Sequence, residues 1–352
     1  MGKIKVLICD DSAMFRKMMV NELSKDNEIE ITGAVPDAYI ARDKIVEDKP
    51  DVLLLDIEMP KIDGITFLQK LMKHYPIRVI IVSSFAEKGS EVAMKAIEYG
   101  ALEVMCKPGV EYSLSDMVEQ LIDKIKEVAC VPEEKLKILA ETVTPAKENP
   151  EFSVSAVINK INSINKIIAI GASTGGTEAL KEILEKMPVN MPPIAIVQHM
   201  PQHFTKTFAE RLDLTCDIEV KEAGDMEILS SGKAYLAPGN RHMQIIKSGA
   251  VYYAKLYDGP LIYHQRPAVE NLFLSVANCA GKNAVGVILT GMGKDGAAGL
   301  LEMKKRGAYT IAQDEKSCVV FGMPKEAIKL GAVSRIEVLA KIPDAIIKAV
   351  SM

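Results

Sequence analysis

Carboxylate, hydroxyl and ammonium side chains follow successive predicted strands in the first third of the chain. They are Asp10 and Asp11, Asp56, Ser83 and Lys107. Because the carboxyl ends of parallel strands meet at one edge of a sheet, we expect these side chains to converge. Three carboxylates repel one another unless a cation lies among them, and Mg²⁺ prefers such oxygen ligands. Asp56 is then a nucleophile that accepts a phosphoryl group, whose oxygens Lys107 and Ser83 would bind. Each acid taken singly could instead be an ordinary helix cap.

A second group of residues suits nucleophilic catalysis by a serine. The stretch IAIGASTGG, residues 168–176, places Ser173 in a glycine-rich turn between a predicted strand and a predicted helix. This turn fits the GxSxG pattern, in which a tight strand-to-helix turn exposes the serine, and the helix N-terminus stabilises nearby negative charge. The pattern by itself is at least as typical of a phosphate or dinucleotide site.

Two later residues could complete such a site. His199 follows the apolar run IAIV and could accept the proton of Ser173. Asp295 follows the strand-like VGVILTG and could orient the imidazole, while backbone N–H groups around Met292 could form an oxyanion hole. A structural histidine, and a turn or helix cap at Asp295, are the alternatives. The order Ser, His, Asp along the chain differs from the Ser, Asp, His order of α/β-hydrolases.

These residues depend for their positions on alternating strands and helices. Apolar runs predict five strands in the first part of the chain, with helices between them. The predicted strands are Ile4–Cys9, Ile31–Val35, Asp51–Asp56, Arg78–Ser83 and Leu102–Met105. Such βα units favour a parallel sheet with right-handed crossovers.

A proline-containing stretch interrupts the alternation before it resumes. Residues 129–160 predict a linker that is helical around Glu133–Glu141. Beyond it the alternation continues to the last residues, and Ser248-Gly249 predicts an antiparallel hairpin. We therefore predict one domain over 1–128 and a second, doubly wound and mainly parallel α/β domain with that hairpin over 161–352.

Composition and charge exclude several classes of protein. Of 352 residues 48% are apolar, which is typical of a globular chain. The six cysteines lack CxxC spacing, so a disulfide framework and a structural zinc site are both disfavoured. We expect a cytoplasmic protein, because no apolar run reaches about 20 residues and the first residues do not resemble a signal peptide. Residues 160–352 carry 23 Lys and Arg against 19 Asp and Glu, too few and too scattered for a nucleic-acid surface.

The first part of the chain resembles a response-regulator receiver domain, which has a (βα)5 flavodoxin-like fold. The resemblance rests on the paired acids after the first strand and on DIEMPKIDG, SS and KPG. It implies phosphorylation at Asp56, and Mg²⁺ bound by Asp10, Asp11, Asp56 and the carbonyl of Glu58. It also implies that Ser83 and Lys107 are the switch residues. One departure is Val104, which occupies the position where receivers usually carry an aromatic switch residue.

The whole chain resembles the chemotaxis protein-glutamate methylesterases of the CheB family. Their blocks occur in order here as IGASTGGTEAL, QHMP, APGNRHM, RPAVE, LTGMGKDGAAG and FGMP. The resemblance implies a catalytic triad of Ser173, His199 and Asp295, with Thr174 and Met292 in the same site. The implied reaction is hydrolysis of glutamate methyl esters, and deamidation of certain glutamines, on chemoreceptors. A chemotaxis histidine kinase would be the phosphodonor, and no cofactor is implied for the esterase chemistry.

Three other functions compete with this interpretation. A response regulator that binds DNA would need a basic recognition helix, and a nucleotide-binding domain would need GxGxxG or a P-loop lysine at the Ser173 turn. The third alternative is a protein that scaffolds receptors without catalysis, and only a measurement of activity can exclude it. We expect neither nucleic-acid binding nor membrane insertion, and we hypothesise that the unphosphorylated first domain covers the Ser173 site.

Overall fold

The computed structural model describes residues 2–59, 63–83, 87–108, 114–142 and 165–352. The chain divides into two compact units, Met1–Asn149 and Pro150–Met352. Helix α6 (Glu133–Thr142) agrees with the helix expected at the start of the predicted linker. The remainder of that linker lies largely outside the described residues, and the predicted domain boundaries stay predictions.

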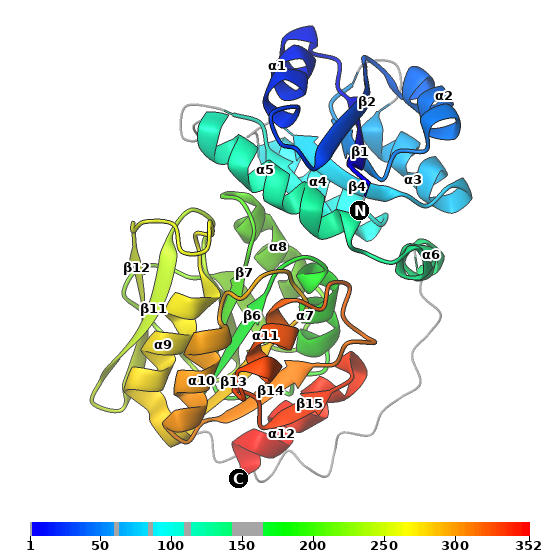
Figure 1. Ribbon diagram of the computed structural model, residues 1–352. Coiled ribbons are helices and arrows are strands. Elements are labelled where there is room, and N and C mark those ends of the chain that lie inside the picture. Colours follow the sequence, from blue (N-terminus) through cyan, green and yellow to red (C-terminus); the bar gives the residue numbers. More distant parts are fainter. Residues whose placement is uncertain (1, 60–62, 84–86, 109–113, 143–164) are drawn as a thin grey trace. The chain divides into compact units, whose positions relative to one another are not determined.

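The first unit contains a five-stranded parallel sheet (Figure 1). Its strands are β1 (Ile4–Cys9), β2 (Ile29–Val35), β3 (Val52–Leu55), β4 (Arg78–Ser83) and β5 (Glu103–Cys106), in the spatial order β2-β1-β3-β4-β5. The central strands are buried along nearly their whole length, as their continuous apolar runs predict. Because β1 and β3 pair directly, the acids that follow them emerge next to each other.

Helices connect these strands, and side chains cap several of them. They are α1 (Ala13–Leu23), α2 (Ala38–Asp48), α3 (Gly64–His74), α4 (Glu87–Glu98) and α5 (Leu114–Ala129). Ser12 caps α1, because its side chain accepts the N–H of Phe15. The sequence reading did not identify α2, whose buried face consists only of Ala38, Ala41 and Ile45. Asp37, which caps α2, was the available signal.

The second unit contains a seven-stranded parallel sheet, which confirms the doubly wound fold (Figure 1). Its strands are β6 (Ile167–Ala172), β7 (Ile194–Gln198), β8 (Glu219–Glu222), β10 (Lys233–Leu236), β13 (Ala284–Ile288), β14 (Tyr309–Gln313) and β15 (Arg335–Glu337). The spatial order is β15-β14-β13-β6-β7-β10-β8. The chain therefore adds β7, β8 and β10 on one side of β6, with β10 between β7 and β8, and then returns to add β13, β14 and β15 on the other. Ligand sites of such sheets lie at this reversal, beyond the carboxyl ends of the central strands.

An antiparallel sheet of three strands adjoins the helices of the second unit. It consists of β11 (His242–Ser248), β12 (Val251–Tyr257) and β9 (Glu227–Ile228). The hairpin between β11 and β12 agrees with the Ser248-Gly249 signal, and Gly249 adopts a φ of 60°. The sequence reading did not identify β9 and β15, because strands of two or three residues carry no periodic pattern.

Helices complete the second unit. They are α7 (Gly176–Leu184), α8 (Phe204–Asp213), α9 (Val269–Ala280), α10 (Ala297–Lys305), α11 (Met323–Lys329) and α12 (Ile342–Ser351). Helix α9 packs against β11, β6 and α10, so its buried side chains join the hairpin and the main sheet into one core. Among the described residues, none of the helices combines the length and the hydropathy that crossing a membrane requires.

Candidate catalytic and phosphorylation sites

Ser173 lies in the turn between β6 and α7, at the reversal of the second sheet. Its backbone N–H donates to the carbonyl of Thr290 at 3.0 Å. Its carbonyl accepts the N–H of Gly176 at 2.7 Å and the Nε2–H of Gln198 at 2.9 Å. These three bonds fix the serine backbone from three segments of the chain. Gln198 was not identified as a site residue from sequence, although it begins the QHMP block.

The glycines around Ser173 are required by close approach and by backbone conformation. A Cβ on Gly171 would lie 2.2 Å from Cγ1 of Val269, and one on Gly176 would lie 2.1 Å from Oε1 of Gln198. Gly175 has a φ of 78°, which side chains other than glycine rarely adopt. The glycines therefore have two causes. Residues of α9 and β7 pack closely against Gly171 and Gly176, and the turn requires the backbone conformation of Gly175.

His199 is placed beside Ser173 by the register of two strands. Ala172 pairs with Gln198, and the N–H of His199 donates to the carbonyl of Ala172 at 3.1 Å. Ser173 and His199 are thus the first residues beyond two paired strand ends. The His199 side chain is buried, with Nε2 lying 2.8 Å from Oδ2 of Asp295. Because an ionised carboxylate only accepts hydrogen bonds, we assign the proton to Nε2, which leaves Nδ1 as the basic nitrogen.

Asp295 is held by three donors in the interior of the second unit. Besides His199, the backbone N–H of Val269 donates to Oδ2 at 2.7 Å, and that of Glu270 donates to Oδ1 at 2.8 Å. Both donors belong to the first turn of α9, where N–H groups are not used within the helix. A buried carboxylate held in this way can orient an imidazole and stabilise its protonated form.

The other two residues predicted for this site lie next to the serine in sequence or in space. Thr174 follows Ser173, is fully buried, and its carbonyl accepts the Oγ1–H of Thr290 at 2.9 Å. Gly291 precedes Met292 and comes so close to the serine that a Cβ there would lie 2.6 Å from Ser173 Cβ. The turn that carries Met292 thus lies against Ser173. Donation by its backbone N–H to an oxyanion stays a prediction.

His242 belongs to the same neighbourhood and has a structural role. Its Nε2 lies 2.9 Å from the carbonyl of Pro260, and its Nδ1 accepts the N–H of Ala268 at 3.3 Å. Burial lowers the pKa of this imidazole, so the neutral form that these two bonds require is favoured. His242 therefore fixes the segment that leads into α9.

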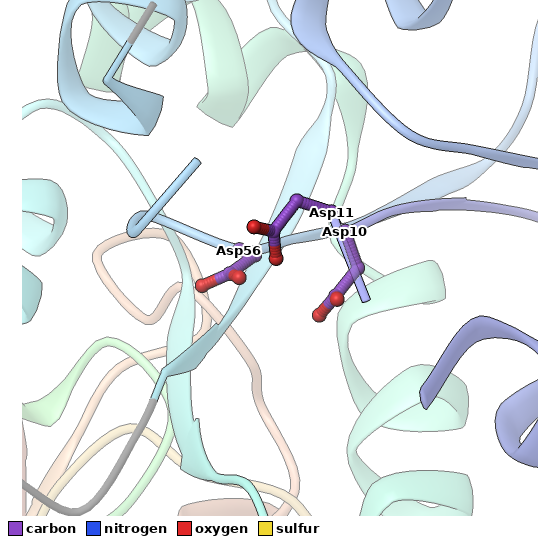
Figure 2. Close-up of side chains that lie close together, drawn as sticks. All are labelled: Asp10, Asp11 and Asp56. Carbon is purple, nitrogen blue, oxygen red and sulfur yellow. The ribbon is translucent and has the colours of Figure 1, made fainter. Parts of the chain in front are cut away.

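Acids gather at the carboxyl edge of the first sheet, as expected. Oxygens of Asp10, Asp11 and Asp56 lie within 4.8 Å of one another (Figure 2). Figure 2 shows the three side chains lying close together, and they follow β1 and β3 in sequence. Asp10 and Asp56 are buried, whereas Asp11 is exposed. Burial raises the pKa of the Asp10 carboxyl, although its bond to a lysine opposes that effect. Three hard oxygen donors around one point, with an open side, fit a Mg²⁺ ion.

The other residues predicted for the phosphorylation site surround Asp56. Nζ of Lys107 lies 2.6 Å from Oδ2 of Asp56 and 2.8 Å from Oδ2 of Asp10. Burial alone would lower the pKa of the Lys107 ammonium, but these two carboxylates raise it above its ordinary value. Within the described residues, Oγ of Ser83 is buried and has no hydrogen-bond partner. The N–H of Glu58 donates to Oδ1 of Asp56 at 3.1 Å, so its backbone belongs to the site.

Val104 lies within β5, three residues before the lysine. It is 7% exposed and pairs with Ile81 of β4. A buried valine cannot rotate between an inner and an outer position as an aromatic ring would. What this substitution does to signalling from Asp56 stays a prediction.

Two family models match separate parts of the chain. The family model for the CheB methylesterase matches residues 168–346, and that for the response regulator receiver domain matches residues 6–119. The chain is 54% identical over 350 residues to "Protein-glutamate methylesterase/protein-glutamine glutaminase 2" of Syntrophus aciditrophicus (strain SB), covering 99% of this chain and 100% of that protein. It is 46% identical over 353 residues to the protein of the same kind from Salmonella typhi, covering 100% and 98%.

One solved structure resembles the second unit. The crystal structure of the Thermotoga maritima CheB methylesterase catalytic domain is 41% identical and superposes with a TM-score of 0.51. The match covers 52% of this chain and 97% of that one.

Proposed function

The chain belongs to the CheB methylesterase family, and we propose that Ser173, His199 and Asp295 are the triad with which it hydrolyses glutamate methyl esters and deamidates glutamines on chemoreceptors. The chain is a protein-glutamate methylesterase and protein-glutamine glutaminase with a receiver domain. The observation that carries the proposed triad is the 2.8 Å contact of His199 Nε2 with Asp295 Oδ2, directly beside the turn that holds Ser173.

In the proposed first half-reaction, Nδ1 of His199 takes the proton of Ser173 Oγ as that oxygen attacks the ester carbonyl. Asp295 stabilises the imidazolium that forms. The bond from carbon to the methoxy oxygen then breaks, and methanol leaves with the proton from Nδ1. The product is a glutamyl ester of Ser173. With a glutamine substrate the same step releases ammonia.

The second half-reaction repeats the path with water as the nucleophile. His199 takes a proton from water as the water oxygen attacks the acyl carbonyl, and returns it to Ser173 Oγ as the acyl bond breaks. The negative carbonyl oxygen of both tetrahedral intermediates would lie near the backbone N–H of Met292 and residues of the Ser173–Thr174 turn. One well-placed donor of this kind contributes about 2.7–4 kcal/mol to lowering the barrier.

We propose that Asp56 is the phosphorylated residue and that a chemotaxis histidine kinase supplies the phosphoryl group. Asp10, Asp11, Asp56 and the Glu58 carbonyl would hold Mg²⁺, which when bound supplies positive charge beside the phosphoryl oxygens. Lys107 already pairs with Asp56 and would then pair with those oxygens. Ser83, which is buried, would donate to one of them. Phosphorylation would raise esterase activity by shifting a two-state equilibrium.

The proposed partners follow from this chemistry. The substrates would be methylated and amidated chemoreceptors, reached from the cytoplasm, where the kinase also acts. The proposed esterase chemistry uses the triad and its oxyanion donors and needs no cofactor. We propose no nucleic-acid partner.

Methanol release from methylated chemoreceptor membranes tests the proposal. We would compare the full-length chain, Ser173→Ala and, as a matched control, Ser248→Ala at the exposed end of β11. We expect release by the unchanged chain and by the control, and essentially none by Ser173→Ala. Release by Ser173→Ala at the rate of the unchanged chain would overturn the assignment of the nucleophile.

A further inference from the structure

Gln198 is the last residue of β7, and its side chain reaches the turn that holds Ser173. Ala172 and Gln198 pair at the ends of β6 and β7, so Ser173 and His199 directly follow this pair. The Gln198 side chain is buried, and its Nε2 donates to the carbonyl of Ser173 at 2.9 Å and to that of His199 at 3.3 Å. One amide nitrogen therefore holds the backbones of the proposed nucleophile and of the proposed base.

The orientation of this amide follows from the groups that it faces. Backbone carbonyls only accept hydrogen bonds, so the amide atom between the two carbonyls must be the nitrogen, whose two hydrogens can serve both. An oxygen in that place would be repelled by both carbonyls. The amide thus supplies donors that neither an apolar side chain nor an ionised acid of the same size could supply.

The other end of the same amide has no partner. Oε1 of Gln198 is buried and accepts no hydrogen bond within the described part of the chain. It lies against Gly176, where a Cβ would come within 2.1 Å of it. A buried acceptor without a donor lowers the stability of the fold. Gln198 therefore costs stability at one end of its amide, while the other end bonds to the two proposed triad residues.

Gln313 shows how the same residue type is satisfied at another strand end of this sheet. It ends β14, is fully buried, and uses both ends of its amide. Its Oε1 accepts the N–H of Thr290 at 2.8 Å, and its Nε2 donates to Oγ of Ser317 at 3.3 Å. Hydrogen bonding alone accounts for a glutamine at that position, whereas the unpartnered oxygen of Gln198 calls for a role other than stability.

We propose that Gln198 is a positioning residue for the esterase reaction, which aligns Ser173 with His199 through their backbone carbonyls. This inference rests on the proposed triad. The N–H of His199 bonds to the carbonyl of Ala172, which joins β7 to β6 one residue before the serine. The two bonds of Gln198 extend that connection to Ser173, whose Oγ must reach Nδ1 of His199. A misplacement of about 1 Å between reacting groups can cost roughly 10²-fold in rate.

This role predicts a loss of rate without a loss of substrate binding or of stability. If the two donors are removed, the Ser173 backbone keeps its bonds to Gly176 and Thr290, so the turn still forms. The nucleophile and the base are then less well aligned, which lowers kcat. KM should change little, because Gln198 is only 3% exposed and is not placed to touch the substrate.

The test uses the full-length chain, methylated chemoreceptor membranes and methanol release. Gln198→Met keeps a side chain of similar size and removes both donors together with the unpartnered oxygen. We expect this variant to lower kcat by roughly tenfold to a hundredfold, with KM nearly unchanged. Its midpoint of urea unfolding should be no lower than that of the unchanged chain, because the unpartnered oxygen is also gone.

A second variant and a control separate the donors from the shape of the side chain. Gln198→Glu keeps the shape but places a carboxylate oxygen against the two carbonyls, so it should lower kcat at least as much and also lower the urea midpoint. Gln244→Met is the matched control. Gln244 is half-buried on β11, and its Nε2 donates to the phenol oxygen of Tyr257 at 3.4 Å. The same substitution there should leave kcat and KM unchanged.

Three results would overturn the inference. The first is a kcat of Gln198→Met equal to that of the unchanged chain. The second is a lower kcat that is fully accounted for by loss of folded protein in circular dichroism. The third is a higher KM with an unchanged kcat, which would make Gln198 a substrate-binding residue. Ser173→Ala is measured alongside: if it stays active, the proposed triad fails, whereas a normal Gln198→Met beside an inactive Ser173→Ala overturns only this inference.

Discussion

Nε2 of His199 and Oδ2 of Asp295 lie 2.8 Å apart, although 96 residues separate them in sequence. The contact arises because β6 is the strand at which the second sheet reverses its direction of growth. His199 follows β7 on one side of β6, and the segment with Asp295 follows β13 on the other. The strand order therefore brings the segments that follow β7 and β13 to the end of β6, which Ser173 follows.

Asp295→Asn should abolish most of the activity without unfolding the chain. The amide would present a donor where His199 needs an acceptor, so the imidazole would be held in the wrong tautomer. We expect kcat for methanol release to fall by roughly 10⁴, as expected when a triad loses its acid. The control is Asp258→Asn, because Asp258 is exposed and pairs with Arg241. A kcat within tenfold of the unchanged chain would contradict the role given to Asp295.

Asp56→Asn should remove the response to a phosphodonor and leave the basal rate. The amide cannot form an acyl phosphate, while the triad lies in the other unit. We would measure methanol release with and without a small phosphodonor and Mg²⁺. Asp43→Asn is the control, because Asp43 is exposed on α2 and pairs with Arg42. A phosphodonor response that persists in Asp56→Asn would show that activation does not pass through this residue.

Gly171→Ala should destabilise the second unit. The added methyl group would overlap Val269, whose Cγ1 would lie 2.2 Å away, and Val269 belongs to the hydrophobic core of the second unit. Overpacking of this kind costs about 1–3 kcal/mol. Urea unfolding followed by circular dichroism measures the change. Gly2→Ala is the control, since nothing lies within 4 Å of a Cβ there, and an equal change in both variants would contradict the explanation.

His242 should make the stability of the second unit fall in mild acid. Burial lowers the pKa of its imidazole in the folded chain, so as pH falls the unfolded chain takes up the proton first. Neutral His242 therefore makes its full contribution to the free energy of unfolding above about pH 6.5. Below that pH the contribution is lost, by about 1.4 kcal/mol for each unit by which the pKa of His242 in the folded chain lies below its pKa in the unfolded chain. His242→Asn should show a shallower decline in unfolding free energy between pH 7 and 5. Equal slopes in His242→Asn and in the unchanged chain would show that His242 does not contribute to the loss of stability in acid.

Much of the fold could be predicted from sequence, because long apolar runs such as β1 and β6 and strongly amphipathic helices leave clear periodic signals. The misses have physical causes. Helix α2 buries mostly alanine, and β9 and β15 are too short for a pattern. The residues placed around the two sites converge because parallel strands share a carboxyl edge.

The capping of α9 by Asp295 could not be predicted in that way. RPAVE was recognisable as a family block, but its Val269 is far from Asp295 in sequence. Their hydrogen bond depends on how closely α9 and α10 pack, and a Cβ on Gly296 would lie 2.4 Å from Cγ1 of Val269. The same holds for Gln198, whose side chain fixes the Ser173 carbonyl from the next strand.

The most direct test of the central claim is whether Ser173 and His199 act as one unit. We would measure kcat for methanol release by Ser173→Ala, by His199→Gln and by the chain that carries both changes. Residues of one catalytic unit give strongly non-additive losses, because removing either disables the other. The account predicts that the doubly changed chain is no slower than the slower single variant. Losses that multiply in the doubly changed chain would show that the two residues act independently, and would contradict a serine activated by His199.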